Sequence, residues 1–227
     1  MDYLTKTNKE LMKICKEKAL KGYSGKKKDI LLEMLTSITK IETPVQDSYT
    51  KDLLREQYAL HKAYVNGRIN TTKKIGVKVR LPSIPEDISE NIIKQIINNK
   101  LNDTTSSWDC KKGDLQSKKE GSQECKCFTS DGPPSFTPSS NWDVIYFLDG
   151  RKWLNDNFVL YRVDLKRTST EWKNIKVSKT QTFEEQTKQG RRPRITWESL
   201  KPQINSYCTK VYDGTFDDIF NPLEAKE

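Results

Sequence analysis

Apolar residues near the start of the chain recur at helical spacing. The positions from Leu11 to Ala19 predict a short helix that Asn8 caps. The glycine-containing segment 21–25 breaks this pattern, and a second helix is predicted from Lys26. The apolar face of the second helix consists of Ile30, Leu31, Met34 and Leu35.

The pattern changes again before residue 100. Residues 50–65 predict a third helix that ends at Gly67, and His61 lies in it as a packing or surface residue. The basic segment 72–80 fits either an edge strand or a linker. The stretch 83–86 has the pattern of a capping box with an early proline, which predicts a helix start. The buried face of that helix is expected to be Ile88, Ile92, Ile93, Ile96 and Ile97.

Three later segments have the pattern of strands. Residues 123–128 alternate, whereas 143–148 and 158–165 are apolar on both faces, as expected of central strands covered by helices. A Pro/Ser/Gly-rich loop over 129–141 joins the first two, and a short helix is expected near 183–188. The fold class expected is α/β (α+β), a central sheet flanked by helices, preceded by a small N-terminal helical region.

Charge and cysteine content restrict the classes of function. Lys and Arg number 40 against 31 Asp and Glu, so the net charge of +9 favours a polyanionic partner over a generic basic protein. No apolar run approaches the roughly 20 residues that span a bilayer, and the N-terminus lacks the apolar core of a signal peptide. Five cysteines without a disulfide spacing and a single histidine favour an intracellular location and disfavour structural zinc.

The candidate catalytic residues cluster around the triplet Glu124-Cys125-Lys126. Residues two apart in a strand share a face, so Glu124 and Lys126 project together about 6.6 Å apart, with Cys125 and Cys127 packed on the opposite face. A hairpin before this strand would bring Asp114 beside the triplet. Adjacent carboxylates repel each other, so the arrangement suits a divalent cation such as Mg²⁺. An exposed hairpin with ordinary surface charges is the alternative.

These residues resemble the PD-(D/E)xK nucleases. The resemblance covers roughly residues 81–200 and extends to type II restriction endonucleases, including those of large DNA viruses of algae. Its blocks are Lys112-Gly113-Asp114-Leu115, Glu124-Cys125-Lys126-Cys127-Phe128, Ser130-Asp131-Gly132-Pro133, Ser135-Phe136, Trp142-Asp143 and Tyr146-Phe147-Leu148-Asp149. It implies a mixed β-sheet core, Mg²⁺-dependent cleavage of double-stranded DNA, a homodimer on a short palindromic site, and a virus-encoded or virion-packaged enzyme.

The resemblance also assigns roles to individual residues. The implied catalytic set is Asp114, Glu124, Lys126 and Glu90. In this set the aspartate and Glu124 match the metal ligands, and Lys126 matches the catalytic lysine. Glu90 stands for the helix carboxylate that many members add, with Glu86 as the second candidate. Gly113 stands where the family name has proline, so Asp109 is an alternative first ligand.

The N-terminal segment resembles a SAP-type DNA-binding motif, a helix–extended turn–helix unit. Lys26, Lys27 and Lys28 begin its second helix, where phosphate would meet both lysines and free N–H groups. A helical hairpin with a solvated lysine cluster is the alternative. The expected domains are this motif over 1–38, a helical linker region over 39–80 and the nuclease domain over 81–227.

Further DNA contacts are expected from loops near the sheet. The candidates are Ser130, Ser135, Lys166, Arg167, Arg191, Arg192 and Arg194. The arginines fit base reading and phosphate contact equally well. The leading hypothesis is a sequence-specific type II restriction endonuclease that uses Mg²⁺. The alternatives are a non-catalytic DNA-binding protein and a non-specific repair or recombination nuclease of the same superfamily.

Overall fold

The computed structural model describes residue 3 and residues 5–17, 22–41, 49–108 and 114–222, without the side chains of 36–41. The chain forms two compact units, residues 1–46 and residues 47–227. Within the described ranges, no helix is both long and apolar enough to cross a membrane.

The small unit is a pair of helices, α1 (Asn8–Glu17) and α2 (Lys28–Ile41), around a core of Leu11, Cys15, Leu31 and Leu35. The predicted cap was wrong by one residue. Thr7 caps α1, because its Oγ1 accepts a hydrogen bond from the Glu10 amide at 3.4 Å while Glu10 Oε2 accepts from the Thr7 amide at 2.7 Å. Helix α2 begins at Lys28, two residues later than predicted.

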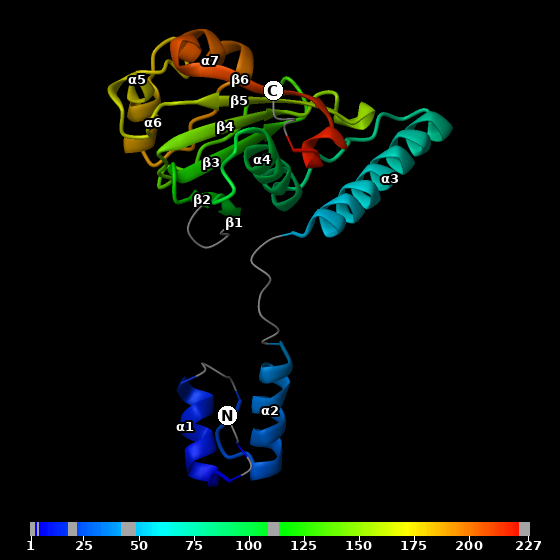
Figure 1. The fold of residues 1–227 in the computed structure, drawn as a ribbon, viewed down its shortest axis with the longest axis vertical. Helices are drawn as coiled ribbons and strands as arrows, with labels where there is room; N and C mark the ends of the chain where they lie inside the picture. Colours follow the sequence, from blue (N-terminus) through cyan, green and yellow to red (C-terminus); the bar gives the residue numbers. More distant parts are fainter. Residues whose placement is uncertain (1–2, 4, 18–21, 42–48, 109–113, 223–227) are drawn as a thin grey trace. The chain divides into compact units, whose positions relative to one another are not determined.

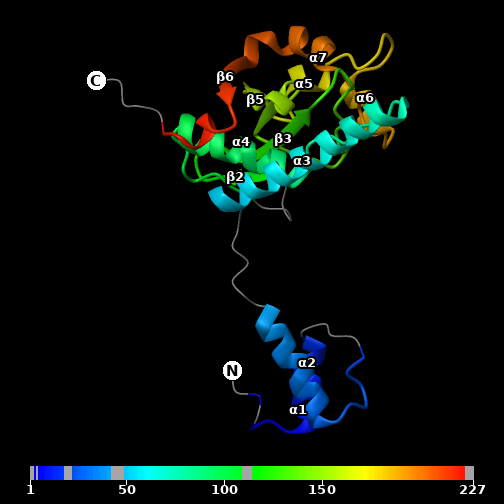
Figure 2. The same ribbon diagram turned by 90° about the vertical axis from the view of Figure 1, so that its right-hand side faces the viewer.

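Helix α3 (Lys51–Ile75) opens the large unit and is longer than predicted. Gly67 lies inside the helix instead of ending it, because the helix continues until Gly76 adopts a left-handed φ of 68°. Leu54, Tyr58 and Val65 are buried in the core of the large unit. The helix is therefore part of the large unit, although it lies in the segment that the sequence pattern assigned to a linker. Figure 2 shows it on the outside of the large unit.

Helix α4 (Glu86–Lys100) covers one face of the sheet, as Figure 1 shows. All five predicted isoleucines are buried along it. The predicted capping box was wrong: Pro85 is the N-cap, and no side chain caps the helix. Proline instead sets the backbone for the first turn and supplies no amide that needs a partner.

The six-stranded sheet is mixed. Its strands lie in sequence order: β1 (Ser107–Trp108), β2 (Leu115–Ser117), β3 (Gly121–Phe128), β4 (Val144–Asp149), β5 (Asn157–Val163) and β6 (Cys208–Thr215). Neighbours are antiparallel except for β3 and β4, which are parallel. The sequence pattern missed β6 because much of this edge strand is exposed.

Short helices cover the other face of the sheet (Figure 1). They are α5 (Thr170–Lys173), α6 (Phe183–Lys188) and α7 (Trp197–Ile204), and α6 occupies the predicted stretch. Three 3₁₀ turns, η1 (Trp153–Asn155), η2 (Asn205–Tyr207) and η3 (Asp218–Phe220), complete the unit. An aromatic-rich core forms under these helices, including Phe136, Trp142, Phe147, Trp172 and Trp197. The sheet therefore has a helical cover on each face, as the two doubly apolar strands predicted.

Candidate functional site

A tight hairpin brings Asp114 to strand β3. Strands β2 and β3 pair antiparallel with Leu115 opposite Gln123, which sets Asp114 next to Glu124. Asp114 Oδ2 accepts a hydrogen bond from the Cys125 amide at 2.7 Å, so the carboxylate is held on the strand. The juxtaposition predicted from a hairpin is confirmed.

Gly121 makes this hairpin possible. Its φ is 78°, and a Cβ at this position would lie 2.4 Å from Asp143 Oδ2. Asp143 in turn accepts a hydrogen bond from the Ser122 amide at 3.1 Å, which joins the start of β3 to the start of β4. The close approach of Asp143 and the left-handed backbone both require glycine.

Glu124 and Lys126 project from the same face of β3, as predicted. Lys126 Nζ lies 2.6 Å from Glu124 Oε1 and 3.9 Å from Asp114 Oδ2, so one ammonium group contacts both carboxylates. The same ammonium lies 5.9 Å from the centroid of the Phe136 ring. The backbone of both residues pairs with β4, Glu124 opposite Ile145 and Lys126 opposite Phe147, whereas β2 pairs with β3 only as far as Gln123.

Cys125 and Cys127 alternate with them and face the α4 side of the sheet. Cys125 is buried in the core, and Cys127 packs against its edge. Burial raises the pKa of the Cys125 thiol and raises that of Cys127 to about 12. Both thiols therefore stay neutral and pack as small apolar groups, as predicted.

Burial and mutual contact set the charges of Asp114, Glu124 and Lys126, which we call the triad. Burial raises the pKa of Asp114 and of Glu124, and Lys126 offsets part of each rise. Burial alone would lower the pKa of Lys126, but Glu124 and Asp114 raise it above its ordinary value. Lys126 is therefore a permanent cation near neutral pH, held between two carboxyl groups that ionise reluctantly.

Glu90 approaches the triad from helix α4. Its Oε2 accepts a hydrogen bond from Trp108 Nε1 at 2.6 Å. Burial, followed by repulsion from Asp114, raises the pKa of Glu90 to about 7. Glu86, four residues earlier on the same helix, is exposed and borders the same cleft. Sequence reasoning found both glutamates but missed Trp108, which lies in a strand of only two residues.

An open cleft of about 350 Å³ joins these groups. Its walls include the triad, both glutamates, Ser135, Ser140 and Arg192. Among the described residues, no group of three or more His, Cys, Asp or Glu is close enough to hold a metal ion. Two carboxylates nevertheless fit Mg²⁺, which keeps several waters and binds through one or two carboxylates plus substrate phosphate. The alternative ligand Asp109 lies outside the described residues.

Some of the predicted DNA-contacting residues line the cleft, and others lie elsewhere. Arg192 and Ser135 border the cleft, and the backbone of Ser135 forms a bridge with Arg194. Arg191 donates to Gln181 Oε1 at 3.0 Å and lies outside the cleft lining. Lys166 forms an ion pair of 3.1 Å with Asp143. Lys26, Lys27 and Lys28 are exposed residues of the small unit.

Arg167 differs from the surface residue that the sequence suggested. It is buried, with its guanidinium 4.7 Å from the centroid of Phe183 and 3.7 Å from Glu184 Oε2. Burial lowers its pKa, and Glu184 offsets part of that shift. The residue therefore packs against α6, and the exposed position that the sequence suggested for it was wrong. His61 has the packing role predicted for it, stacked on Trp153 with ring centroids 5.4 Å apart.

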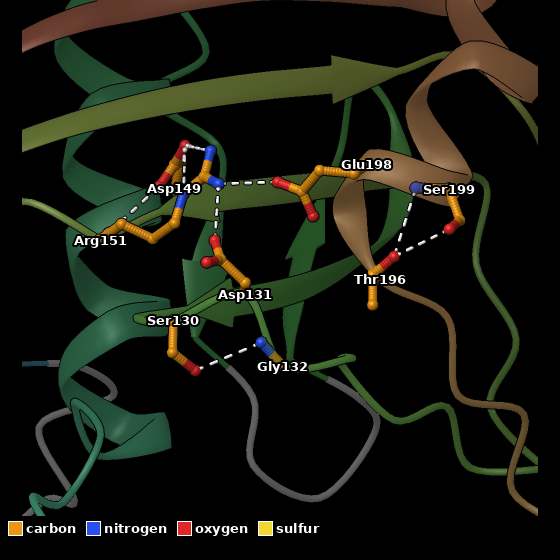
Figure 3. Close-up of polar contacts among 8 residues, drawn as sticks. All are labelled: Ser130, Asp131, Gly132, Asp149, Arg151, Thr196, Glu198 and Ser199. Carbon is orange, nitrogen blue, oxygen red and sulfur yellow. Dashed lines mark hydrogen bonds and ion pairs between the residues drawn. The ribbon is translucent and has the colours of Figure 1, made fainter.

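A second polar network includes the loop that follows β3, and Figure 3 shows it. Arg151 donates to Asp149 at 2.7 Å, to Asp131 at 3.0 Å and to Glu198 at 2.7 Å. It thereby ties the ends of β3 and β4 to the start of α7. Ser130, a predicted DNA contact, accepts from the Gly132 amide at 3.3 Å within its own turn. No local pattern predicted this network, because its members come from three separate segments.

Together, a mixed sheet and a carboxylate–carboxylate–lysine cluster in an open cleft define a candidate metal-dependent hydrolase. The chain belongs to the Bsp6I restriction endonuclease family, whose model matches residues 50–203. It is similar to the type II restriction enzyme Bsp6I of Bacillus sp. (strain RFL6), with 42% identity over 62 residues. That match covers 27% of this chain and 34% of the relative, so the chain spans about a third of its length. No solved structure matches.

Proposed function

We propose that this protein is a sequence-specific type II restriction endonuclease that hydrolyses phosphodiester bonds of double-stranded DNA with Mg²⁺. A homodimer acting at a short palindromic site is part of the proposal. The observation that carries it is the meeting of Asp114, Glu124 and Lys126 in one open cleft, in a chain of net charge +9. Membership of a restriction endonuclease family supports it.

Asp114 and Glu124 would hold the cation. One oxygen of Asp114 is engaged by the Cys125 amide, which orients the carboxylate and leaves its other oxygen for a ligand. When bound, Mg²⁺ supplies positive charge at the phosphate and lowers the pKa of a coordinated water. The raised pKa values of both carboxyl groups support this role, because buried carboxylates with a shortage of positive charge favour a cation.

Lys126 would act as a cation and not as a base. Its raised pKa means that the ammonium keeps its proton near neutral pH, so it orients the attacking water or stabilises charge developing on the phosphate. Arg192, which borders the cleft, is the candidate for a second contact to the phosphate. Glu90 supplies a third carboxyl group that takes up or releases a proton near neutral pH.

The small unit would add affinity with little sequence demand. Its lysines at the start of α2, together with the glycine turn at 22–25, support the SAP-like interpretation. Contacts from lysine to phosphate carry no sequence information, so sequence reading is assigned to loops of the large unit. Arg191 and Arg194, which lie outside the cleft lining, are the candidates for base contact.

Plasmid digestion tests the proposal. Unmethylated plasmid and phage DNA are incubated with the full chain in Mg²⁺ and, separately, in EDTA. Discrete fragments that require Mg²⁺ are expected, and Lys126→Ala is expected to abolish them while DNA binding persists. Lys118→Ala is the matched control, because Lys118 lies exposed in the turn between β2 and β3.

Three other outcomes contradict the proposal in different ways. A smear instead of fragments indicates a non-specific nuclease. Intact DNA with a mobility shift indicates a binding protein without catalysis. Fragments that persist in Lys126→Ala show that the catalytic lysine lies elsewhere.

A further inference from the structure

The outward side of helix α3 exposes apolar residues. Among the described residues, eight large hydrophobic side chains are exposed, and six of them lie between residues 53 and 81. On α3 itself they are Leu53, Leu60, Tyr64 and Ile75, with exposed fractions of 41%, 58%, 57% and 58%. Exposed apolar residues gathered on one helix face mark an interaction site more often than scattered single residues do.

Helical geometry places these residues in one line. Successive members of this set are separated by seven, four and eleven residues, which brings all four to within about 60° on the same side of the helix. The buried residues Leu54 and Tyr58 face the core on a different side. We call Leu53, Leu60, Tyr64 and Ile75 the outer stripe. It is a second apolar face on a helix whose first face is already packed, and Figure 2 shows that α3 lies on the outside of the large unit.

We propose that the outer stripe is the contact between two copies of this chain, with their α3 helices antiparallel. Charge along the helix supports this occupant. Glu56 and Lys74 are both exposed and stand eighteen residues, about five turns, apart, so they lie on the same flank of the stripe at opposite ends. A two-fold axis perpendicular to the helices brings Glu56 of each copy towards the partner's Lys74, twice over. Leu60 and Tyr64 then lie between the two charged ends.

The position of the outer stripe also fits contact with a second copy. This argument rests on the proposed function. The large unit carries one triad, and cutting both strands of a duplex requires hydrolysis at two phosphates. Tyr64 borders a hollow that reaches Leu81 and Ser83, and Ser83 also borders the catalytic cleft. Pairing through the stripe therefore puts the dimer contact beside the cleft of each copy.

Sedimentation of the full chain without DNA or metal tests the surface. The wild type is expected to be a dimer at tens of micromolar. Leu60→Asp and Tyr64→Asp are each expected to raise the dimer dissociation constant about a hundred-fold, because a charge then faces the partner's apolar stripe. Both side chains are exposed, and unchanged circular dichroism confirms that each variant is folded. A monomeric wild type, or variants that remain dimeric, overturns the proposal.

Charge reversal tests the antiparallel arrangement separately. Glu56→Lys and Lys74→Glu are each expected to weaken the dimer about ten-fold, and the double variant is expected to restore it. Lys73→Glu is the matched control, since it changes the neighbouring lysine about 100° round the helix. Failure of the double variant to restore the dimer, or an equal effect of Lys73→Glu, refutes the arrangement. None of these measurements needs DNA cleavage, so a chain that dimerises without cutting DNA contradicts only the proposed function.

Discussion

Replacing Glu90 by glutamine is expected to stabilise the metal-free protein at alkaline pH. The carboxyl group has its pKa raised from 4.5 to about 7 in the folded chain, chiefly by burial and then by repulsion from Asp114. Below pH 4.5 both folded and unfolded chains hold the proton, and the group costs nothing. Between pH 4.5 and 7 the unfolded chain ionises while the folded chain resists, so stability falls as the pH rises.

The size of the effect follows from the shift. A shift of about 2.5 pKa units at about 1.4 kcal/mol per unit gives an upper bound of about 3.5 kcal/mol. Glu90 is only partly buried, so solvent screening reduces this to about 1–2 kcal/mol. Glutamine keeps an oxygen that can accept the hydrogen bond from Trp108, which removes the charge without losing the contact.

The measurement is urea unfolding in EDTA at pH 4.5 and pH 8, followed by tryptophan fluorescence. All five tryptophans lie between residues 108 and 197, so the signal reports the large unit alone. Glu90→Gln should match the wild type at pH 4.5 and exceed it by about 1–2 kcal/mol at pH 8. Glu86→Gln, which changes an exposed carboxyl group on the same helix, is the control and should stay within about 0.5 kcal/mol. A Glu90→Gln advantage that is the same at both pH values would refute the reasoning.

Three further substitutions test the fold that holds the site. Gly121→Ala should destabilise the chain by about 1–3 kcal/mol in urea unfolding, because its backbone is left-handed and its Cβ would meet Asp143; an unchanged midpoint would contradict the hairpin geometry. Arg167→Ala should cost about 2–4 kcal/mol, because it removes a buried side chain that packs on Phe183 and leaves Glu184 with the exposed Lys188 as its partner. Lys166→Ala should cost under about 0.5 kcal/mol, and equal effects would argue against a structural arginine. Thr50→Ala should cost about 1 kcal/mol of the same stability, since Thr50 Oγ1 accepts from the Leu53 amide at 3.1 Å, and no loss would show that α3 needs no cap.

The triad was predictable because it depends on local rules. Alternation along a strand fixes the shared face of Glu124 and Lys126, and a short hairpin fixes Asp114 beside them. The doubly apolar segments identified β4 and β5 for the same reason, since burial on both faces leaves a direct mark on the sequence.

Other features depend on contacts that no local pattern records. Gly67 is a residue typical of helix ends, yet α3 continues past it to Ile75, and Ile69 beyond the glycine packs against the core. Arg167 resembles its exposed neighbour Lys166 in sequence and differs only because Phe183 and Glu184, sixteen and seventeen residues later, enclose it. The pKa of Glu90 likewise depends on Trp108 and Asp114, which reach it from other elements.

The parallel pairing of β3 and β4 gives strand β3 two neighbours that differ in their distance along the sequence. The β2–β3 hairpin closes over three residues, so the contact between Asp114 and Cys125 forms from nearby sequence. The β3–β4 pairing requires the chain to return along the whole strand through residues 129–143 before one bond can form. We therefore expect a folding chain to bring Asp114 to the Cys125 amide early, while the buried surroundings that raise the pKa of the carboxyl groups form with the slower, long-range step. The geometry of the candidate site and its electrostatics are then expected to form at separate times, which hydrogen exchange during refolding would detect.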